Sequence, residues 1–225
     1  MENEEGSLLL INKPLQWTSF DVVNKLRYIL GTKKIGHAGT LDPLATGLLI
    51  ICTGRMTKKI DEYQGLEKEY VGTLNLGQTT ASYDLETEPT PFQDVSKITK
   101  SEIQLAAASF KGHIQQVPPI HSSIRVNGQR AYTLARNGKE FSLSPREVEI
   151  KEFEITDIQI PSVAFRVVCS KGTYIRSLAH DVGQKLGVGA YLSQLCRTRI
   201  GDYLLRDAQT LEEIGARLSK AKAST

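Results

Sequence analysis

Cysteine is scarce in this chain of 225 residues, which has only Cys52, Cys169 and Cys196. An odd number of widely spaced cysteines with no C-x-x-C pair indicates neither a disulfide framework nor a zinc site. The four histidines show no ligand spacing either, so the sequence predicts no metal centre. We interpret the cysteines as small buried side chains in a reducing compartment.

A long hydrophobic run is also missing from the start of the chain. The opening MENEEGSLLLIN has an acidic front and only four consecutive apolar residues, Leu8 to Ile11. It matches neither a signal peptide nor a membrane span. We therefore expect a cytoplasmic protein that does not enter a membrane.

An excess of charge of one sign is lacking too, because 28 Lys and Arg face 25 Asp and Glu, for a formal net charge of +3. The basic residues nevertheless gather in four segments: Lys33-Lys34, Arg55 to Lys59, Arg125 to Lys139 and Arg197 to Arg206. Such clusters fit a face that follows RNA phosphates. A solvated surface would give similar clusters, so charge alone leaves both interpretations open.

Hydrophobic periodicity predicts an α+β fold. Alternation and short apolar runs indicate strands, and apolar residues three and four positions apart indicate helices. The expected strands are 8–12, 48–52, 69–76, two between 146 and 170, and roughly 190–205. The expected helices are 19–31, 101–110, about 173–186 and 211–221. Their irregular order predicts a mixed, largely antiparallel central sheet flanked by helices and loops.

Capping residues give the expected helix ends. We predict Ser19 as the N-cap of the first helix and Gly31 as its C-terminal stop. Ser101 is the expected cap of the second helix, with Gln104 at the capping-box position. Gly172-Thr173 would start the third.

The segment Gly36 to Gly47, GHAGTLDPLATG, is the strongest candidate for chemistry. It forms a Gly-rich, Pro-containing loop around Asp42 and leads into Leu48 to Cys52, an apolar run that we expect to be a strand buried on both faces. Its glycines would let the backbone approach something closely. An Asp-Pro dipeptide alone usually marks a turn, but the length of the whole string favours a functional loop.

This string resembles the nucleophile motif of the bacterial tRNA pseudouridine synthases that modify the T-loop uridine, position 55 of tRNA. Further motifs of that family follow in order: Asn12-Lys13-Pro14 with Trp17-Thr18-Ser19, Lys68-Glu69-Tyr70, Gln116 to Pro119, Cys169 to Arg176, and Tyr191 to Leu195. The resemblance runs from about Leu8 to Gly201. It implies the pseudouridine synthase fold and an isomerase that flips the target base and attacks its ribose with a carboxylate, without a cofactor or a metal.

The resemblance also assigns roles to single residues. Asp42 would be the nucleophile, and Arg176 would keep it ionised and oriented. Tyr70 would stack on the uracil and could act near the base during proton transfer. Tyr174 would hold the carboxylate or the arginine by a hydrogen bond.

Four more residues would contact the substrate. Leu195 would close the apolar wall of the pocket, and His37 would fill the gap that the extracted base leaves. Lys13 and Arg125 would complete the substrate-binding set. The partner that the family implies is the T-arm of tRNA, bound by a monomer.

The domain organisation that we expect is one catalytic domain, residues 1–225, with an RNA-binding arm inserted at about 116–146. Arg125, Arg130, Arg136 and Lys139 suit an arm that grips stem phosphates. Many relatives continue into a small, PUA-like C-terminal RNA-binding domain, which we expect to be absent here. A weaker affinity for tRNA would follow.

Three residues depart from the family motifs, and two alternative functions remain open. Gln16 stands where the family motif usually has glycine, so we expect the turn after Pro14 to differ, and Ser123 and Arg125 stand where Ala and Lys are usual. An RNA-binding or tRNA-folding protein with incidental or lost catalysis is the main alternative. A glycosidase-like carboxylate enzyme normally needs a second acid, which no comparable motif marks.

Overall fold

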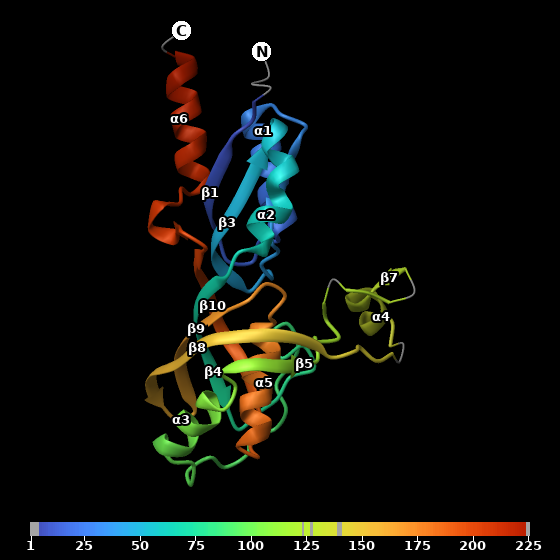
Figure 1. Ribbon diagram of the computed structural model, residues 1–225, viewed down its shortest axis with the longest axis vertical. Coiled ribbons are helices and arrows are strands. Elements are labelled where there is room, and N and C mark those ends of the chain that lie inside the picture. The colour runs from blue at the N-terminus through green and yellow to red at the C-terminus, as the bar shows by residue number, and fades with distance from the viewer. Residues whose placement is uncertain (1–4, 123, 127, 139–140, 224–225) are drawn as a thin grey trace. The chain divides into compact units, whose positions relative to one another are not determined.

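The computed structural model describes residues 5–122, 124–126, 128–138 and 141–223, and of Arg125, Val126, Tyr132, Ala135, Arg136 and 221–223 the backbone alone (Figure 1). The chain forms two compact units. Unit 1 comprises residues 1–70 and 195–225, and unit 2 comprises residues 71–194. No helix within the described residues is long and apolar enough to cross a membrane.

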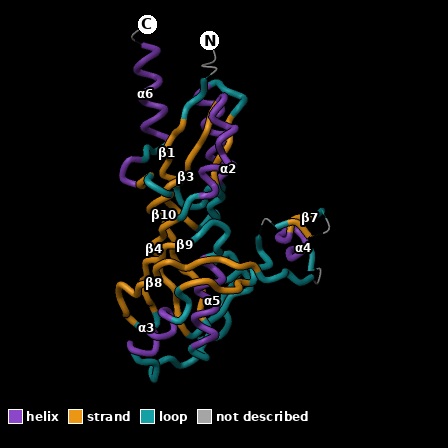
Figure 2. Tube along the Cα trace, viewed as in Figure 1, coloured by secondary structure: helices purple, strands orange, loops and turns teal. Residues whose placement is uncertain are grey.

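Strands and helices follow one another irregularly along the chain (Figure 2). The strands are β1 (Leu8–Lys13), β2 (Ile35–Ala38), β3 (Ala45–Thr53), β4 (Lys68–Leu76), β5 (Gly112–Gln116), β6 (Arg125–Val126), β7 (Gln129–Arg130), β8 (Arg146–Gln159), β9 (Ser162–Cys169), β10 (Ala190–Ile200) and β11 (Tyr203–Leu204). The helices are α1 (Ser19–Leu30), α2 (Ile60–Gly65), α3 (Lys100–Ala108), α4 (Ala131–Arg136), α5 (Ile175–Lys185) and α6 (Leu211–Ala223), with 3-10 turns η1 (Gly54–Lys59) and η2 (Leu205–Asp207).

Nine strands of the described residues join in one sheet. Their order is β1-β3-β10-β4-β9-β8-β5, with β2 paired to β3 and β11 paired to β10. The pairs β1/β3, β2/β3, β5/β8, β8/β9 and β10/β11 are antiparallel, whereas β3 and β10 are parallel. The prediction of a mixed, largely antiparallel sheet in an α+β fold is therefore confirmed.

Strand β3 is the centre of unit 1 and is buried on both faces, as its apolar run predicts. Successive side chains of a strand point to opposite faces. Leu49 and Ile51 pack with α1 and with Leu211 and Ile214 of α6. Leu48, Ile50 and Cys52 belong to a second cluster, which receives side chains from η1, α2 and β11. One strand thus supplies two hydrophobic cores.

One face of strand β9 contributes side chains to the core of unit 2. Val163, Phe165, Val167 and Cys169 alternate along that strand and are all buried, as the period of two predicts. Helix α5 contributes Leu178, Ala179 and Val182 to the core of the same unit. Near the start of α5, Arg176 and Ser177 instead form hydrogen bonds with main-chain carbonyls.

Several elements differ from the sequence prediction at their ends. Thr18, not Ser19, is the N-cap of α1, and it forms a capping box with Asp21. The cap of α3 is Thr99 with Glu102, not Ser101 with Gln104. Both threonines have extended backbone, which a cap requires, whereas the predicted serines lie inside the helices.

Two further helix ends and one additional strand can be compared with the prediction. Gly31 is the left-handed C-cap that we predicted for α1. Helix α5 begins at Ile175 with Tyr174 as its N-cap and with no side-chain cap, so Gly172-Thr173 does not cap it. Strand β2 was missed, because four residues that include a glycine leave little periodic signal.

Candidate active site

The loop around Asp42 is shorter than the sequence suggests. Gly36, His37 and Ala38 belong to β2, and Ala45 begins β3, so a turn of six residues, Gly39 to Leu44, carries the carboxylate. The backbone N–H of Ala45 donates to the carbonyl of Asp42 at 3.1 Å and closes the turn. Asp42 therefore lies three residues before β3, a strand in which every residue except Thr46 is buried.

Arg197 of β10 braces this turn from inside unit 1. Its guanidinium is 1% exposed and donates to the carbonyl of Leu48 at 2.7 Å, of Gly39 at 3.3 Å and of Thr40 at 3.4 Å. One planar group thereby joins both ends of the segment that contains Asp42. The interpretation of Arg197 as part of a phosphate-following face is wrong, because the side chain is buried.

The same arginine explains a glycine of the motif. Gly47 has a φ of 105°, and a Cβ added there would lie 2.4 Å from the carbonyl oxygen of Arg197. Strand β10 runs parallel to β3 at this point, with Arg197 opposite Gly47. The predicted close approach of the backbone is thus an approach to β10.

Lys13 braces the turn from β1. The side chain is completely buried, and its ammonium donates to the carbonyls of Pro14 at 2.9 Å, of Trp17, and of Pro43 at 3.5 Å. Burial lowers the pKa of Lys13 from 10.5 to about 8, against the opposing effect of the Asp42 charge, which raises it. Lys13 is therefore mostly protonated at pH 7, and its donors serve protein carbonyls.

Ser19 and Gln16 complete the support of the turn. The hydroxyl of Ser19 accepts from the N–H of Leu41 at 2.9 Å and donates to the carbonyl of Leu41 at 3.2 Å. The N–H of Gln16 donates to the carbonyl of Pro43 at 2.8 Å. Gln16 has a φ of 66°, so the turn after Pro14 has the left-handed backbone that glycine favours although glycine is replaced.

These contacts determine the electrostatics around Asp42. Every carbonyl from Gly39 to Pro43 accepts a hydrogen bond. Two of the donors, Lys13 and Arg197, are buried cations, and carbonyls do not neutralise them. A carboxylate beside two buried positive charges is favoured in its ionised form. The arrangement therefore suits a nucleophile or an anion that stabilises a developing positive charge.

His37 lies on β2 opposite Ile51 of β3. Burial lowers the pKa of His37; a hydrogen bond with the Gly39 backbone opposes this, and the charge of Arg197 lowers it further. The imidazole is therefore neutral at pH 7. Its Nδ1 is buried and has no hydrogen-bond partner among the described residues.

Tyr70 and Leu195 lie on the two strands that both units share. Tyr70 is on β4 and is buried, and Leu195 of β10 pairs with Ala45, three residues after Asp42. The hydroxyl of Thr46 donates to the carbonyl of Leu195 at 3.4 Å. Leu195 is thus paired with the first residue of β3, three residues after Asp42.

Arg176 lies at the start of α5 in unit 2 and is 4% exposed. Its guanidinium donates to the carbonyls of Ser82 at 3.2 Å and His121 at 3.0 Å. Its Nε lies 3.6 Å from a carboxylate oxygen of Asp84, which is itself buried. The sequence predicts no role for Asp84, because no motif marks it.

The base of the arm is fastened to the same end of α5. The side-chain amide of Gln116 accepts from the N–H of Tyr174 at 2.8 Å and donates to its carbonyl at 3.0 Å. The hydroxyl of Ser177 donates to the carbonyl of Val117 at 2.8 Å. Tyr174 and Arg176 are therefore brought together with the first residues of the arm.

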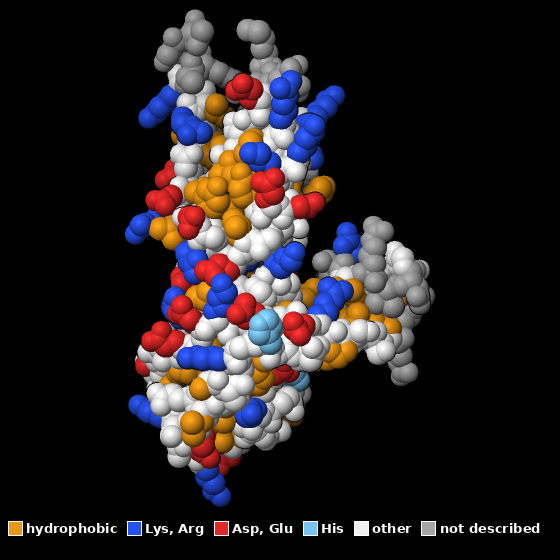
Figure 3. Space-filling model, in the orientation of Figure 1, with side chains coloured by type: hydrophobic (Ala, Val, Ile, Leu, Met, Phe, Trp, Pro, Cys, Tyr) orange, Lys and Arg blue, Asp and Glu red, His pale blue; other side chains and the backbone are white. Residues whose placement is uncertain are grey.

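The arm itself holds a short hairpin, β6 and β7, in which Arg125 pairs with Arg130, followed by helix α4. Arg130 is exposed. The side chains of Arg125 and Arg136, and the whole of Ser123 and Lys139, lie outside the described residues. On the face drawn in Figure 3, Lys and Arg are interspersed with Asp and Glu over both units.

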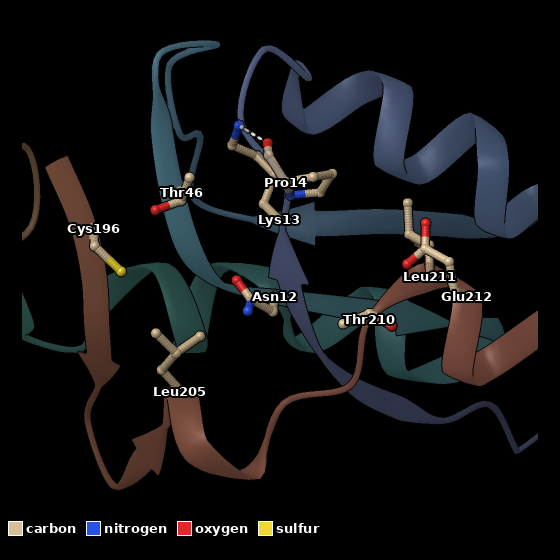
Figure 4. A pocket seen from close by; sticks show the side chains of 9 residues that line it. All are labelled: Asn12, Lys13, Pro14, Thr46, Cys196, Leu205, Thr210, Leu211 and Glu212. Atoms are coloured by element: carbon tan, nitrogen blue, oxygen red, sulfur yellow. Dashed lines mark hydrogen bonds between the residues drawn. The ribbon is translucent and has the colours of Figure 1, made fainter. Parts of the chain in front are cut away.

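A groove of about 340 Å³ in unit 1 lies beside Lys13 and is lined by Asn12, Lys13, Pro14, Thr46, Cys196, Leu205, Thr210, Leu211 and Glu212 (Figure 4). In this view the ammonium of Lys13 points to the Pro14 carbonyl. None of the other predicted site residues lines it. Within the described residues, no three His, Cys, Asp or Glu side chains cluster as metal ligands would.

Comparison with known families gives two matches that together span most of the chain. The N-terminal domain described as TruB family pseudouridylate synthase matches residues 27–175. The domain described as tRNA pseudouridylate synthase B C-terminal domain matches residues 176–224.

Similar full-length relatives share about half of their residues with this chain. The chain is 52% identical to tRNA pseudouridine synthase B of Parabacteroides distasonis, over 93% of this chain and 92% of the relative. It is 54% identical to the protein of the same name from Flavobacterium johnsoniae, over 91% and 92%.

Solved structures with a similar fold include chains of two Cbf5 complexes. The archaeal box H/ACA sRNP Nop10-Cbf5 complex has a chain with TM-score 0.73 and 28% identity, matched over 97% of this chain and 55% of that one. A Cbf5-Nop10-Gar1 complex gives TM-score 0.76 and 28% identity, over 97% and 56%. The chain thus spans just over half the length of these solved chains.

Proposed function

Because the chain belongs to the TruB family of tRNA pseudouridine synthases, an isomerase family, we propose that it converts the T-loop uridine at position 55 of tRNA to pseudouridine with Asp42 as nucleophile. The observation that carries this proposal is the bracing of the Gly39 to Leu44 turn by two buried cations. A turn whose carbonyls from Gly39 to Pro43 are all hydrogen-bonded holds a carboxylate in one place, and the cations keep it charged.

The reaction is balanced within the nucleotide. Asp42 attacks the ribose, the bond between C1′ and N1 breaks, and the electron pair leaves with the uracil. The base rotates, and its C5 attacks C1′; the bond from C1′ to the Asp42 oxygen breaks, and the carboxylate is regenerated. The proton on C5 is then removed and N1 gains one, so no atom or electron is lost. The chemistry thus requires groups that position, stack and move a proton.

We assign those tasks to the residues around the turn. Tyr70 stacks on the uracil and lies close to the C5 proton, and Leu195 forms an apolar wall beside the ribose. Arg176 pairs with Asp42, and its bonds to Ser82, His121 and Asp84 hold the guanidinium in position.

The remaining assignments concern RNA binding. Neutral His37 stacks in the gap that the flipped base leaves in the RNA. This stacking offsets part of the free-energy cost of base flipping, which is a few kcal/mol. Lys13 acts through the turn that it braces, and Tyr174 links Arg176 to the arm. The arm, with Arg125 and Arg130, contacts the phosphates of the T-arm. We propose that the protein acts as a monomer. Because its proposed substrate is tRNA, we also propose that it acts in the cytoplasm.

The decisive experiment incubates the protein with an unmodified T-arm transcript and maps pseudouridine chemically. We expect modification at the T-loop uridine alone, and none in a transcript with cytidine at that position. No product from excess wild-type protein would refute the proposal.

Asp42→Asn tests the nucleophile. We expect turnover to fall by about 10³-fold or more, because no other carboxylate occupies the turn, with RNA affinity within about twofold. Asp61→Asn on α2, an exposed acid of the same unit, is the matched control and should react like wild type. An active Asp42→Asn variant would remove Asp42 from the mechanism.

A further inference from the structure

Two aromatic rings stack beside Arg176 in unit 2, and neither belongs to a motif of the sequence analysis. The rings of Tyr83 and His180 have centroids 3.9 Å apart and planes inclined by 16°. Tyr83 belongs to the turn Thr80 to Asp84, in which its N–H donates to the carbonyl of Thr80 at 3.2 Å. His180 is on α5. The stack therefore joins a turn to a helix.

The backbone of Tyr83 has a conformation that needs support. Its φ is 64°, in the left-handed region, which is unfavourable for a residue with a bulky side chain. Such a conformation persists where its surroundings determine it. Here the carbonyl of Tyr83 accepts from the N–H of Leu192 at 2.9 Å, and the ring rests on His180. The first contact holds the carbonyl of Tyr83, and the second holds its side chain.

The two neighbours of Tyr83 both contact Arg176. The carbonyl of Ser82 accepts from the guanidinium at 3.2 Å, and a carboxylate oxygen of Asp84 lies 3.6 Å from Nε. Arg176 and His180 are four residues apart on α5 and hence on one face of the helix. Ser82, Tyr83 and Asp84 thus all contact the same face of α5. The contact of Tyr83 with His180 lies in sequence between the two contacts with Arg176.

The stack joins two uncharged rings. Burial lowers the pKa of His180, so the imidazole is neutral at pH 7. Burial raises the pKa of Tyr83, and the nearby Asp181 charge raises it further, so the phenol keeps its proton. Two neutral rings pack face to face with an offset at little electrostatic cost.

We propose that Tyr83 and His180 form a positioning pair that fixes the orientation of Arg176 for catalysis. Neither side chain touches the reacting atoms. Without the stack, the Tyr83 backbone relaxes out of the left-handed region and carries the Ser82 carbonyl and the Asp84 carboxylate away from the guanidinium. This inference rests on the proposed role of Arg176.

The test is the single-turnover rate on the T-arm transcript, measured with RNA affinity and melting temperature. Tyr83→Leu removes the ring, Tyr83→Phe keeps it, and Tyr83→Gly removes it while suiting the left-handed backbone. Phe92→Leu, at an exposed aromatic of the same unit, is the matched control.

We expect Tyr83→Leu to slow the chemical step by about tenfold or more, since small misplacements of a catalytic group are costly, with RNA affinity within twofold. Tyr83→Gly should slow it less than Tyr83→Leu, because glycine adopts the left-handed backbone without strain. Tyr83→Phe and Phe92→Leu should react at the wild-type rate. His180→Leu should match Tyr83→Leu, and the double variant should be no slower than the slower single one, because the pair acts as a unit.

Other outcomes overturn the inference. A Tyr83→Leu variant that reacts at the wild-type rate and only melts earlier would leave the stack a structural contact. A Tyr83→Gly variant as slow as Tyr83→Leu would contradict relaxation of the strained backbone as the cause. Additive effects of Tyr83→Leu and His180→Leu would show two independent residues. Active Tyr83 variants beside an active wild type refute this inference alone, whereas an inactive wild type refutes the proposed function and the inference with it.

Discussion

Two buried arginines, one in each unit, are held by different kinds of partner. Within the described residues, Arg197 donates hydrogen bonds to the main-chain carbonyls of Leu48, Gly39 and Thr40. Arg176 donates to two carbonyls and also lies against the Asp84 carboxylate. Carbonyls fix a guanidinium without cancelling its charge, whereas a carboxylate cancels much of it.

The difference indicates two tasks. Arg197 gives the Asp42 turn its shape and leaves a positive charge beside it that the three carbonyls do not cancel. Arg176 is oriented by a neighbouring acid, so a substrate-dependent contact can use its remaining donors without the cost of an uncompensated buried charge. Substitutions should therefore affect folding at Arg197 and catalysis at Arg176.

The largest expected effect is on stability. Arg197→Leu leaves the carbonyls of Gly39, Thr40 and Leu48 without this donor inside unit 1, and we expect a loss of about 3–5 kcal/mol in the free energy of unfolding. Urea denaturation measures it. Arg197→Lys keeps the charge without the planar fork and should lose less. Equal stability of Arg197→Leu and wild type would end the distinction between the two arginines.

The next effect is on catalysis. Arg176→Lys replaces the bidentate group by a point charge and should lower the single-turnover rate by about 10²–10³-fold, with RNA affinity little changed. The same variant should unfold within about 1 kcal/mol of wild type, because a cation remains beside Asp84. A large loss of stability at an unchanged rate would assign Arg176 the task that we give to Arg197.

A smaller effect concerns the support of the Asp42 turn. Ser19→Ala removes the acceptor of the buried Leu41 N–H, and we expect a loss of about 1–3 kcal/mol. Thermal unfolding at several protein concentrations measures it. Ser219→Ala, at an exposed serine of α6, is the control and should change stability by less than about 0.5 kcal/mol.

The smallest effect depends on pH and lies in the unit of Arg176. Burial raises the pKa of Asp181 from 3.8 to about 6, so the folded state binds more protons than the unfolded one between these values. Stability is then lost as pH rises from about 4 to 6, and the penalty is complete above pH 6. At about 1.4 kcal/mol per unit, its upper limit is roughly 3 kcal/mol.

Asp181→Asn should therefore stabilise the protein above pH 6 by about 1–2 kcal/mol, with the gain vanishing below pH 4. Urea titrations from pH 4 to 8 measure it. Asp94→Asn is the opposite case, because hydrogen bonds from Ser96 lower the pKa of Asp94, and its substitution should remove stability above pH 4. A gain for Asp181→Asn that did not vary with pH would contradict the electrostatic cause.

Elements with a strong local pattern could be predicted from the sequence. The alternation in β9 and the apolar run of β3 record burial directly, so both strands were found with their buried faces. The stop at Gly31 was found because few residues other than glycine adopt its backbone. The family motifs singled out Asp42 and Leu195, and the pairing of Leu195 with Ala45 is a finding of the structure.

Features set by tertiary contacts could not be predicted. Ser19 and Thr18 are both good caps, and only the contact of Ser19 with Leu41 decides between them. Arg197 looks like a surface residue in a basic segment, since nothing nearby shows that carbonyls surround it. Asp84 and Tyr83 depend on a turn that approaches α5 from nearly a hundred residues away.

Arg197 also limits how the chain can vary in length. Its guanidinium contacts Gly39 and Thr40 on one side of the turn and Leu48 on the other, so it fixes the number of residues between them. One residue more or fewer after Leu48 would exchange the two cores that β3 supplies, because its side chains alternate. The stretch from Gly39 to Thr53 should therefore accept substitutions at several positions but no insertion or deletion.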